Sequence, residues 1–275
     1  MTDAKAMVSA VARKFLPMEL RNRIRPYWHR LILPNEEKRL IEEIKTLGPE
    51  KRWPSITKQE IIFWQGVLDA NNHDPNLWPE TRSIRTDPEM PLQGYLAILI
   101  DTPPQERVKI LDVGAGPLTS LGKKLPGCIV EITPIDPNAV DYNLLLQRLG
   151  IDPPRRTIYG VAEEIPFPPS SFDLVHARNS IDHTADALKA VQEMFRVVKI
   201  GHCVYLNHKI REGRTEKYMT NHQWDFFPKR GRFYIERPGM AAVDIGHLLG
   251  NCAQISIDSS PDGSEWFSVI IRRSS

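Results

Sequence analysis

The sequence contains few cysteines, and they follow no pattern. Only three occur in 275 residues, and their odd number and wide spacing exclude a disulfide framework. No Cys-x-x-Cys or paired cysteine–histidine spacing indicates a structural zinc site. Free thiols are stable in a reducing compartment, so we expect a cytoplasmic protein.

Long apolar runs and a strong charge of one sign are missing as well. No apolar stretch is long enough to span a bilayer, and no apolar segment with a cleavage site marks a secretory signal. The formal net charge of +2 gives no general attraction to nucleic acid, so we expect no nucleic-acid partner. Basic residues do gather within residues 1–30. They predict either a weak peripheral contact with an anionic membrane surface or, as the interrupting prolines favour, arginines exposed to solvent.

Residues 1–92 are expected to form a helical N-terminal lobe followed by a linker. Residues 35–48 begin with a capping asparagine and end with a glycine, which predicts a helix. Residues 55–71 carry an apolar stripe at helical spacing and predict a second helix. Four prolines within residues 72–92 predict a linker or an active-site loop.

Residues 93–275 alternate apolar strands with helices of crossover length. This alternation predicts an α/β fold, a doubly wound, Rossmann-like and mostly parallel sheet. Two β-rich runs within residues 253–273 are expected to add an antiparallel strand at the C-terminal edge. The irregular insert 211–240 is expected to be a substrate loop. We expect strands at 108–114, 128–137, 155–162, 172–180 and 202–210, and helices at 119–125, 138–150, 185–201 and 241–251.

The stretch KILDVGAGPLTSLG, residues 109–122, joins the first expected strand to the next helix. Its glycines allow backbone N–H groups to approach a ligand closely. Asp112 suits a cationic group such as an ammonium, and Asp136, 24 residues on at the end of the second strand, suits ribose hydroxyls. A helix beginning at Thr119 suits a carboxylate. Ammonium, ribose and carboxylate together describe S-adenosylmethionine; the alternative is that both acids only cap the turn and the next helix.

Several motifs in order resemble one enzyme family. The segment ILDVGAG (110–116) resembles its first motif, and PIDPNA (134–139) resembles the region of its ribose-binding acid. Residues 160–183 resemble its adenine loop and fourth strand, and residues 187–208 its following helix and strand. Residues 107–209 thus resemble class I S-adenosylmethionine-dependent methyltransferases of the small-molecule branch that includes the ubiquinone-biosynthesis type.

The resemblance implies S-adenosylmethionine as cofactor and a set of binding residues. In the numbering of this sequence, these are Asp112, Gly114, Ala115, Gly116, Pro117, Leu118, Asp136, Pro137, Ala162, Glu163 and Asn179. Two positions depart from the family pattern: Leu118 replaces a third glycine, and Val161 replaces an aspartate that often opens the adenine loop. We therefore expect the adenine to rest on the backbone of Ala162, with Glu163 as a polar contact.

Two short segments provide candidate groups for the methyl acceptor. ARNSIDHT (177–184) lies beyond the fourth strand, where ligands of open α/β sheets bind, and there His183 beside Asp182 is a candidate general base. NHQWDFF (221–227) offers His222 as a second candidate base. The expected substrate contacts are Arg178, His208, Gln223 and Trp224. The alternatives are that His183 packs at the start of the next helix and that Trp224 fixes its loop to the core.

The sequence therefore predicts an enzyme that transfers a methyl group from S-adenosylmethionine to a hydroxyl of a small molecule or a glycan. The alternatives are a nitrogen or carbon methyltransferase of a small metabolite, which need not use a histidine base, and a non-catalytic S-adenosylmethionine-binding module. A divalent metal would require distant residues to come together: Asp182, His183, His208 and His222. Because they show no local ligand spacing, we predict no metal.

Overall fold

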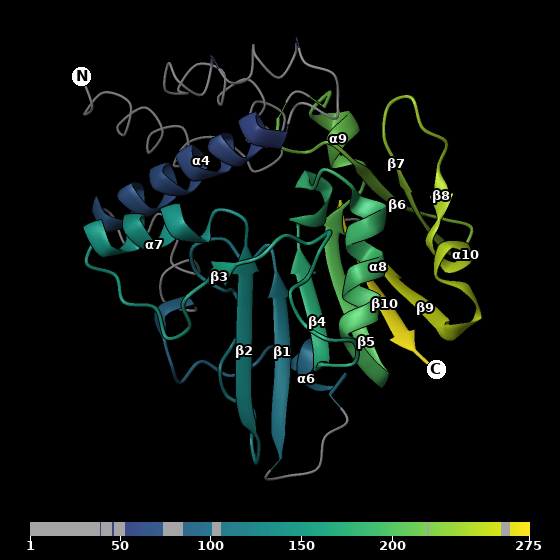
Figure 1. The fold of residues 1–275 in the computed structure, drawn as a ribbon, viewed down its shortest axis with the longest axis horizontal. Helices are drawn as coiled ribbons and strands as arrows, with labels where there is room; N and C mark the ends of the chain where they lie inside the picture. The colour runs from purple at the N-terminus through teal and green to yellow at the C-terminus, as the bar shows by residue number, and fades with distance from the viewer. Residues whose placement is uncertain are drawn as a thin grey trace, which may run out of the picture.

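A seven-stranded sheet forms the centre of this computed structural model (Figure 1). The structure describes Arg39, Thr46 and residues 53–73, 85–100, 106–218, 220–259 and 265–275. The strand order of the large sheet is β3-β2-β1-β4-β5-β10-β9. Its strands are β1 (Arg107–Val113), β2 (Ile129–Asp136), β3 (Ile158–Tyr159), β4 (Phe172–Arg178), β5 (Val198–Lys209), β9 (Ala253–Ser259) and β10 (Trp266–Arg273).

The strand directions define a doubly wound sheet. β1 runs parallel to β2 and β4, while β2 is parallel to β3 and β4 is parallel to β5. β10 is antiparallel to both β5 and β9. This confirms the predicted mostly parallel sheet with an antiparallel addition on the C-terminal side. The chain winds outward from β1 to β3 and then returns to β4, which creates the switch point where open α/β sheets bind ligands.

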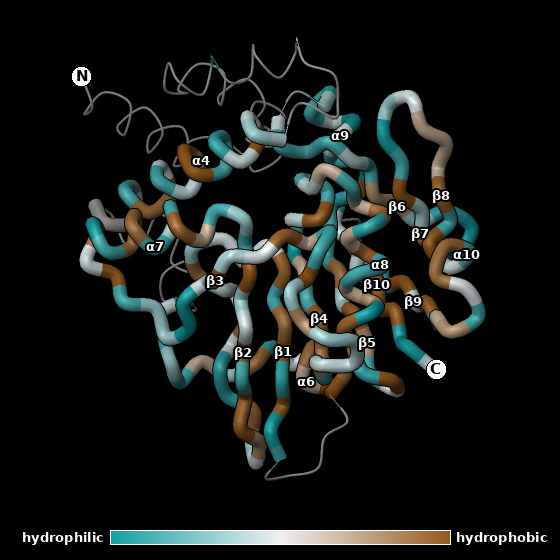
Figure 2. Tube along the Cα trace, viewed as in Figure 1, coloured by the Kyte–Doolittle hydropathy of each residue, from teal (hydrophilic) through white to brown (hydrophobic). Residues whose placement is uncertain are grey.

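Helices and segments cover both faces of the sheet. The helices are α4 (Trp53–His73), α6 (Gly94–Ala97), α7 (Ala139–Arg148), α8 (Ala187–Val197), α9 (Glu212–Thr215) and α10 (Ile245–Leu249). Leu111 and Val113 of β1 pack into a core cluster that includes α8, whereas Ile110 packs into a second cluster with Leu96 of α6. Because successive strand residues point to opposite faces, these clusters lie on the two sides of the sheet. Figure 2 accordingly shows hydrophobic residues along the strands of the large sheet.

Helix α8 shows why the expected helix 185–201 is shorter in the structure. Asp186 caps its start by accepting hydrogen bonds from the backbone N–H groups of Leu188 and Lys189. The helix ends at Val197, and Val198 is already extended as the first residue of β5. Val198 pairs with Phe172 of β4, so sheet pairing outweighs the helical pattern in the β-branched stretch that follows.

The helix expected at residues 119–125 does not form. Instead, this segment pairs with a segment that precedes the sheet: Leu92 N–H donates to the Lys124 carbonyl at 2.7 Å, and Lys123 N–H donates to the Met90 carbonyl at 2.7 Å. These non-local backbone bonds hold the chain out of a helix. The helix N-terminus that was expected to bind a carboxylate is therefore absent at Thr119.

The insert 211–240 also differs from the expected irregular loop. It contains α9 and a hairpin of β6 (Asp225–Lys229) and β7 (Arg232–Glu236), which β8 (Val243–Asp244) extends to a three-stranded sheet. Arg230 and Gly231 have φ angles of 51° and 73°, the left-handed pair that a tight two-residue hairpin turn requires. Phe226 and Phe233 of the hairpin are buried in the main core. The insert is thus a folded element that packs on the sheet.

Helix α4 lies across the carboxyl ends of β1 and β2 (Figure 1). It confirms the helix predicted for residues 55–71. The indole of Trp64 packs so tightly on the turn after β1 that a Cβ added at Gly116 would lie 2.9 Å from the ring. The side-chain amide of Asn138 donates to the Thr57 carbonyl at 3.0 Å, so it connects α7 to α4 and does not cap α7. Helix α4 therefore covers the edge of the sheet at which ligands bind.

Other expectations for the N-terminal part concern residues outside the described ranges. The basic segment 7–33 lies there, as does the helix expected at 35–48 apart from Arg39 and Thr46, and a lobe boundary at residue 92 stays a prediction. Within the described part of the chain, no helix has the length and apolar character that crossing a bilayer requires.

Two glycine variants test whether α4 packs on the turn. Gly116 and Gly150 both have a φ of 65°, but a Cβ at Gly150 would meet nothing within 4 Å. We expect Gly150→Ala to reduce the free energy of unfolding by about 1 kcal/mol through backbone strain, and Gly116→Ala by at least about 1 kcal/mol more, because Trp64 must also move. Urea unfolding measures both. In a Trp64→Ala background the two costs should become equal; equal costs already in the wild-type background would contradict the packing.

Candidate active site

The glycine turn after β1 is fastened to the end of β2 by backbone and carboxylate contacts. Gly114 N–H and Ala115 N–H donate to the Ile135 carbonyl at 2.9 and 3.1 Å. Gly116 N–H donates to Asp136 Oδ2 at 3.0 Å, and Asn138 N–H donates to Asp136 Oδ1 at 2.9 Å. Each oxygen of Asp136 thus keeps a lone pair that can accept a further hydrogen bond. The hydroxyl groups of a ribose are donors of this kind. This placement fits the role that the sequence assigns to Asp136.

The charge of Asp136 is costly in this position. Burial raises the pKa of Asp136 to about 7, although the N–H groups of Asn138 and Gly116 act in the opposite direction. The nearby Glu60 of α4 contributes to the increase. Donors from a bound ribose would stabilise the ionised carboxylate and so lower its pKa again.

Asp112 has different partners from the expected ammonium group. Its Oδ1 lies 2.7 Å from His176 Nδ1, and Thr119 Oγ1 donates to its Oδ2 at 2.6 Å. Asp112 is only 3% exposed. Both of its oxygens therefore join β1 to β4 and to the segment after the glycine turn, and the sequence offered no pattern that pairs Asp112 with His176.

The remaining expected cofactor residues surround the same turn. Ala115, Pro117, Leu118 and Ala162 are buried. Glu163 Oε1 accepts hydrogen bonds from Ala185 N–H at 2.8 Å and Asp186 N–H at 3.1 Å, at the start of α8, and the contact with adenine stays a prediction. Asn179 Oδ1, at the end of β4, is buried without a hydrogen-bond partner. Its neighbour Ser180 lies against Gly114 of the glycine turn, and an unsatisfied acceptor at this place fits a nucleoside with amino and hydroxyl donors.

The predicted catalytic residues are brought together beyond β4 and β5. Asp182 and His183 lie in the 3₁₀ turn Ile181–His183, and His222 comes from the segment before β6. His222 Nδ1 lies 2.6 Å from Asp182 Oδ2 and 3.0 Å from His183 Nε2. His208, from β5, approaches Asp182 Oδ1 to 3.4 Å through its Nδ1. Glu212 of α9 has its Oε2 3.6 Å from His222 Nδ1. We call these five residues the acceptor-side cluster.

Glu60 of α4 is a second carboxylate, besides Asp182, that lies close to the ring of His183. Its Oε1 lies 3.0 Å from His183 Nδ1. Burial lowers the pKa of His183, but Asp182 and Glu60 outweigh it and raise that pKa to about 9. Burial likewise opposes ionisation of Asp182, yet His183 and His222 hold its pKa well below the ordinary value. Sequence reasoning missed both Glu60 and Glu212, because neither belongs to a motif near the predicted base.

The expected substrate residues have mixed positions. Arg178 is exposed, with its guanidinium 5.5 Å from the Trp266 ring centroid. Gln223 N–H donates to the Asp182 carbonyl at 2.9 Å, and the Gln223 side chain donates to the Tyr218 carbonyl at 3.3 Å. Trp224 is 2% exposed and donates to the Thr184 carbonyl at 2.9 Å. It therefore fixes its segment to the core, and we do not retain it as a substrate contact.

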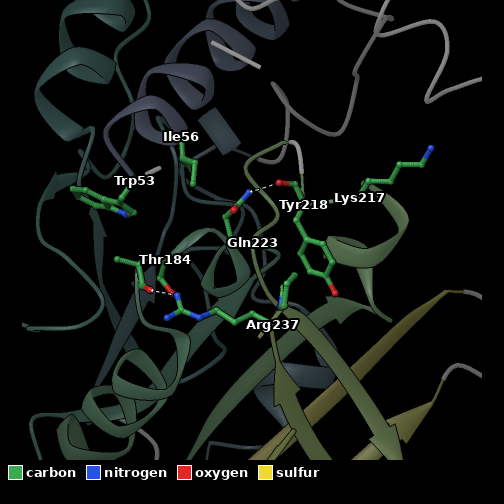
Figure 3. A pocket seen from close by; sticks show the side chains of 9 residues that line it. Trp53, Ile56, Thr184, Lys217, Tyr218, Gln223 and Arg237 are labelled. Atoms are coloured by element: carbon green, nitrogen blue, oxygen red, sulfur yellow. Dashed lines mark hydrogen bonds between the residues drawn. The ribbon is translucent and has the colours of Figure 1, made fainter. Parts of the chain in front are cut away.

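A pocket lies next to the acceptor-side cluster, between α4 and the insert (Figure 3). Its lining includes Trp53, Ile56, Thr184, Tyr218, Gln223 and Arg237. Gln223 follows His222 in the chain and is bonded to the Asp182 backbone, so the pocket and the cluster share one wall. Apolar side chains from α4 face polar ones from the insert, as Figure 3 shows, which suits a small ligand with both characters.

Part of the chain is similar to known proteins. Residues 111–206, from β1 to β5, match the family model described as "Methyltransferase domain". The 2-methyl-6-phytyl-1,4-hydroquinone methyltransferase 1 of Oryza sativa is 24% identical over 204 residues, 72% of this chain and 58% of that protein. The cycloartenol-C-24-methyltransferase of Arabidopsis thaliana is 28% identical over 114 residues, 40% of this chain and 33% of that protein. A solved S-adenosylmethionine-dependent methyltransferase of Aquifex aeolicus is 16% identical, covers 75% of this chain and 97% of its own, and has a TM-score of 0.42.

The fold and site define the class of protein. The doubly wound sheet, the glycine turn at its switch point and the acid at the end of β2 are those of a nucleoside-binding α/β domain. The family match adds that residues 111–206 are similar to a methyltransferase domain, which supports S-adenosylmethionine as the cofactor. The chain spans 58% of the length of the rice relative, so the activity and acceptor of the whole chain are proposals.

The free energy of unfolding should depend on pH because Asp136 is buried and its pKa is raised. The unfolded side chain ionises near 3.8 and the folded one near 7, so between these values the folded state binds more protons. Its contribution to the free energy of unfolding is complete below pH 3.8 and is lost as the pH rises through 7, at up to about 1.4 kcal/mol per pH unit.

The Asp136→Asn variant has no titrating group at this position. Urea unfolding of the cofactor-free proteins gives the difference in free energy of unfolding between the wild type and this variant. We expect that difference, wild type minus variant, to be smaller at pH 8 than at pH 5, and the same change with pH for Asp136→Ala. An advantage that is constant or grows with pH would mean that Asp136 is ionised without cost.

Proposed function

We propose that this chain transfers a methyl group from S-adenosylmethionine to an oxygen of a small molecule, sugars included. The observation that carries the proposal is the arrangement of two sites on one edge of the sheet. Asp136 and the glycine turn lie at the ends of β2 and β1, and the acceptor-side cluster lies beyond β4 and β5. A methyl donor held at the first site therefore faces an acceptor held at the second.

The chain supplies binding, orientation and proton removal. S-adenosylmethionine provides a methyl group on a positively charged sulfur, and an acceptor oxygen in line with that bond displaces S-adenosylhomocysteine. Asp136 holds the ribose hydroxyls, and the turn at Gly114 and Gly116 lets the backbone lie close to the nucleoside. As the new O–C bond forms, the hydroxyl gives its proton to His222, which the carboxylate of Asp182 orients through the Nδ1 contact.

The pocket beside the cluster supports a small acceptor. Trp53 and Ile56 offer apolar surface, while Tyr218 and Gln223 offer polar groups near the chain segment that carries His222. The names of the two plant relatives, a hydroquinone methyltransferase and a cycloartenol methyltransferase, also describe small-molecule acceptors. Carbon methylation is the second candidate reaction, because the Arabidopsis relative is named for the C-24 position of its acceptor.

Calorimetric titration with S-adenosylmethionine tests the cofactor half of the proposal. We expect the wild type to bind one equivalent and Asp136→Ala to bind about 10- to 100-fold more weakly, because hydrogen bonds to a carboxylate are lost. Asp141→Ala changes an exposed acid on nearby α7 and should leave the affinity unchanged. Circular dichroism checks that each variant is folded. Unchanged affinity in a folded Asp136→Ala protein would remove Asp136 from the site.

Turnover tests the acceptor half. The enzyme is incubated with S-adenosylmethionine and a panel of hydroquinone, catechol and simple sugars, and S-adenosylhomocysteine and methylated product are measured by mass spectrometry. We expect His222→Gln to lower kcat by about 100-fold or more while cofactor affinity stays within about twofold, because proton removal fails and binding does not. His247→Gln alters an exposed histidine and is the matched control. A product that carries the new methyl on carbon by NMR would replace oxygen transfer with the second candidate.

A further inference from the structure

Ligand atoms in the acceptor-side cluster converge on one point. One donor atom from each of Asp182, His183 and His222 lies within 4.8 Å of the others. The His183 Nε2 to His222 Nδ1 distance is 3.0 Å, and His222 Nδ1 lies 2.6 Å from Asp182 Oδ2. Ligand atoms bound tetrahedrally at about 2.0–2.1 Å are about 3.3 Å apart. The two nitrogens are close to that separation, and the Asp182 oxygen, now at hydrogen-bond distance from His222, would move outward by about 0.7 Å to share the ion.

Several atoms around this point are buried and have no hydrogen-bond partner. They are Asp182 Oδ1, both ring nitrogens of His208, and Glu212 Oε2. Asp182 and His208 are each only 2% exposed, so water cannot freely satisfy them. Leaving a buried polar group unsatisfied costs about 1–3 kcal/mol, and native proteins contain few such groups. Two carboxylate oxygens and a histidine ring without hydrogen bonds in one buried cluster indicate that a cation completes it.

His183 is oriented as a metal ligand would be. Its Nδ1 lies 3.0 Å from Glu60 Oε1, and Asn221 donates to the same carboxylate oxygen. A carboxylate that accepts the Nδ1 proton leaves the lone pair on Nε2, the nitrogen that points into the cluster. Carboxylates behind ligating histidines are the usual outer contacts of protein metal sites. Glu60 thus acquires a role in positioning His183, although it lies far away in the sequence.

We propose that the acceptor-side cluster binds one divalent transition-metal ion, with Asp182, His183 Nε2 and His222 Nδ1 as ligands and His208 beside them to complete the coordination. Imidazole combined with carboxylate favours ions such as Zn²⁺ and Co²⁺ over Mg²⁺, which prefers oxygen ligands. The site replaces the sequence-based expectation of no metal. It rests on the donor atoms alone. In the ion-bound protein His183 and His222 are ligands, so proton removal by a histidine belongs to the ion-free protein.

The test uses full-length, tag-free protein that has been stripped with a chelator. Calorimetric titration with Zn²⁺ alone should give one ion per chain, and Co²⁺ should produce visible absorption bands of an ion with nitrogen and oxygen ligands. Zn²⁺ should also raise the melting temperature. Absence of saturable binding, or a cobalt spectrum identical to that of the free aqueous ion, would overturn the proposal.

Variants locate the ion. We expect His222→Ala and Asp182→Ala to weaken Zn²⁺ binding by at least about 100-fold. The ring of His208 packs against the ring of Phe226, so His208→Phe keeps an aromatic ring in this place, and we expect it to weaken Zn²⁺ binding less. Glu60→Gln should weaken it by about 10-fold, since it removes only an outer contact. His247→Ala changes an exposed histidine and should bind as the wild type does. Equal Zn²⁺ affinity in a folded His222→Ala protein and in His247→Ala would overturn the assignment.

Discussion

The hydrogen bond from the Gly116 backbone to the Asp136 carboxylate is the contact on which the rest of the site depends. It fixes the turn after β1 against the end of β2, while the second oxygen of Asp136 holds Asn138 at the start of α7. Trp64 of α4 packs on the same glycine. One buried carboxylate thus connects the turn after β1 to the end of β2 and to the beginning of α7. The glycine that it holds is also the one on which α4 packs.

The two halves of the site treat their carboxylates in opposite ways. Asp136 is surrounded by neutral N–H groups, and burial raises its pKa. Asp182 is equally buried, but it lies among imidazoles that lower its pKa and keep it ionised. The first arrangement suits a neutral, hydroxyl-bearing ligand that can donate hydrogen bonds. The second suits positive charge, either as protons on histidines or as a metal ion.

The parts of the fold that depend on local pattern were predictable. Continuous apolar runs located the central strands, and the glycine turn with Asp136 located the cofactor edge, because these features depend on neighbours within a few residues. The helix expected at 119–125 failed because backbone bonds to Met90 and Leu92 outweigh its local preference. The hairpin of β6 and β7 was not predicted, because the insert 211–240 was expected to be an irregular substrate loop.

The candidate site could be predicted only in part, because it is formed by contacts between segments that are distant in the sequence. Asp182, His183 and His222 were each recognised, but their meeting depends on the fold of the insert, and so does the approach of Glu212. Glu60 reaches His183 only because α4 crosses the sheet edge. The contact of Asp112 with His176 was not predicted, because nothing in the sequence pairs the two residues. Residues that act through tertiary contact carry no local signature.

A crystal structure of the chain bound to S-adenosylhomocysteine would test the central claim most directly. We expect the nucleoside at the switch point, with its ribose hydroxyls within hydrogen-bond distance of the Asp136 carboxylate and its sulfur directed toward Asp182, His183 and His222. A nucleoside bound elsewhere, or one whose ribose is held by other groups while Asp136 keeps only its backbone partners, would contradict it.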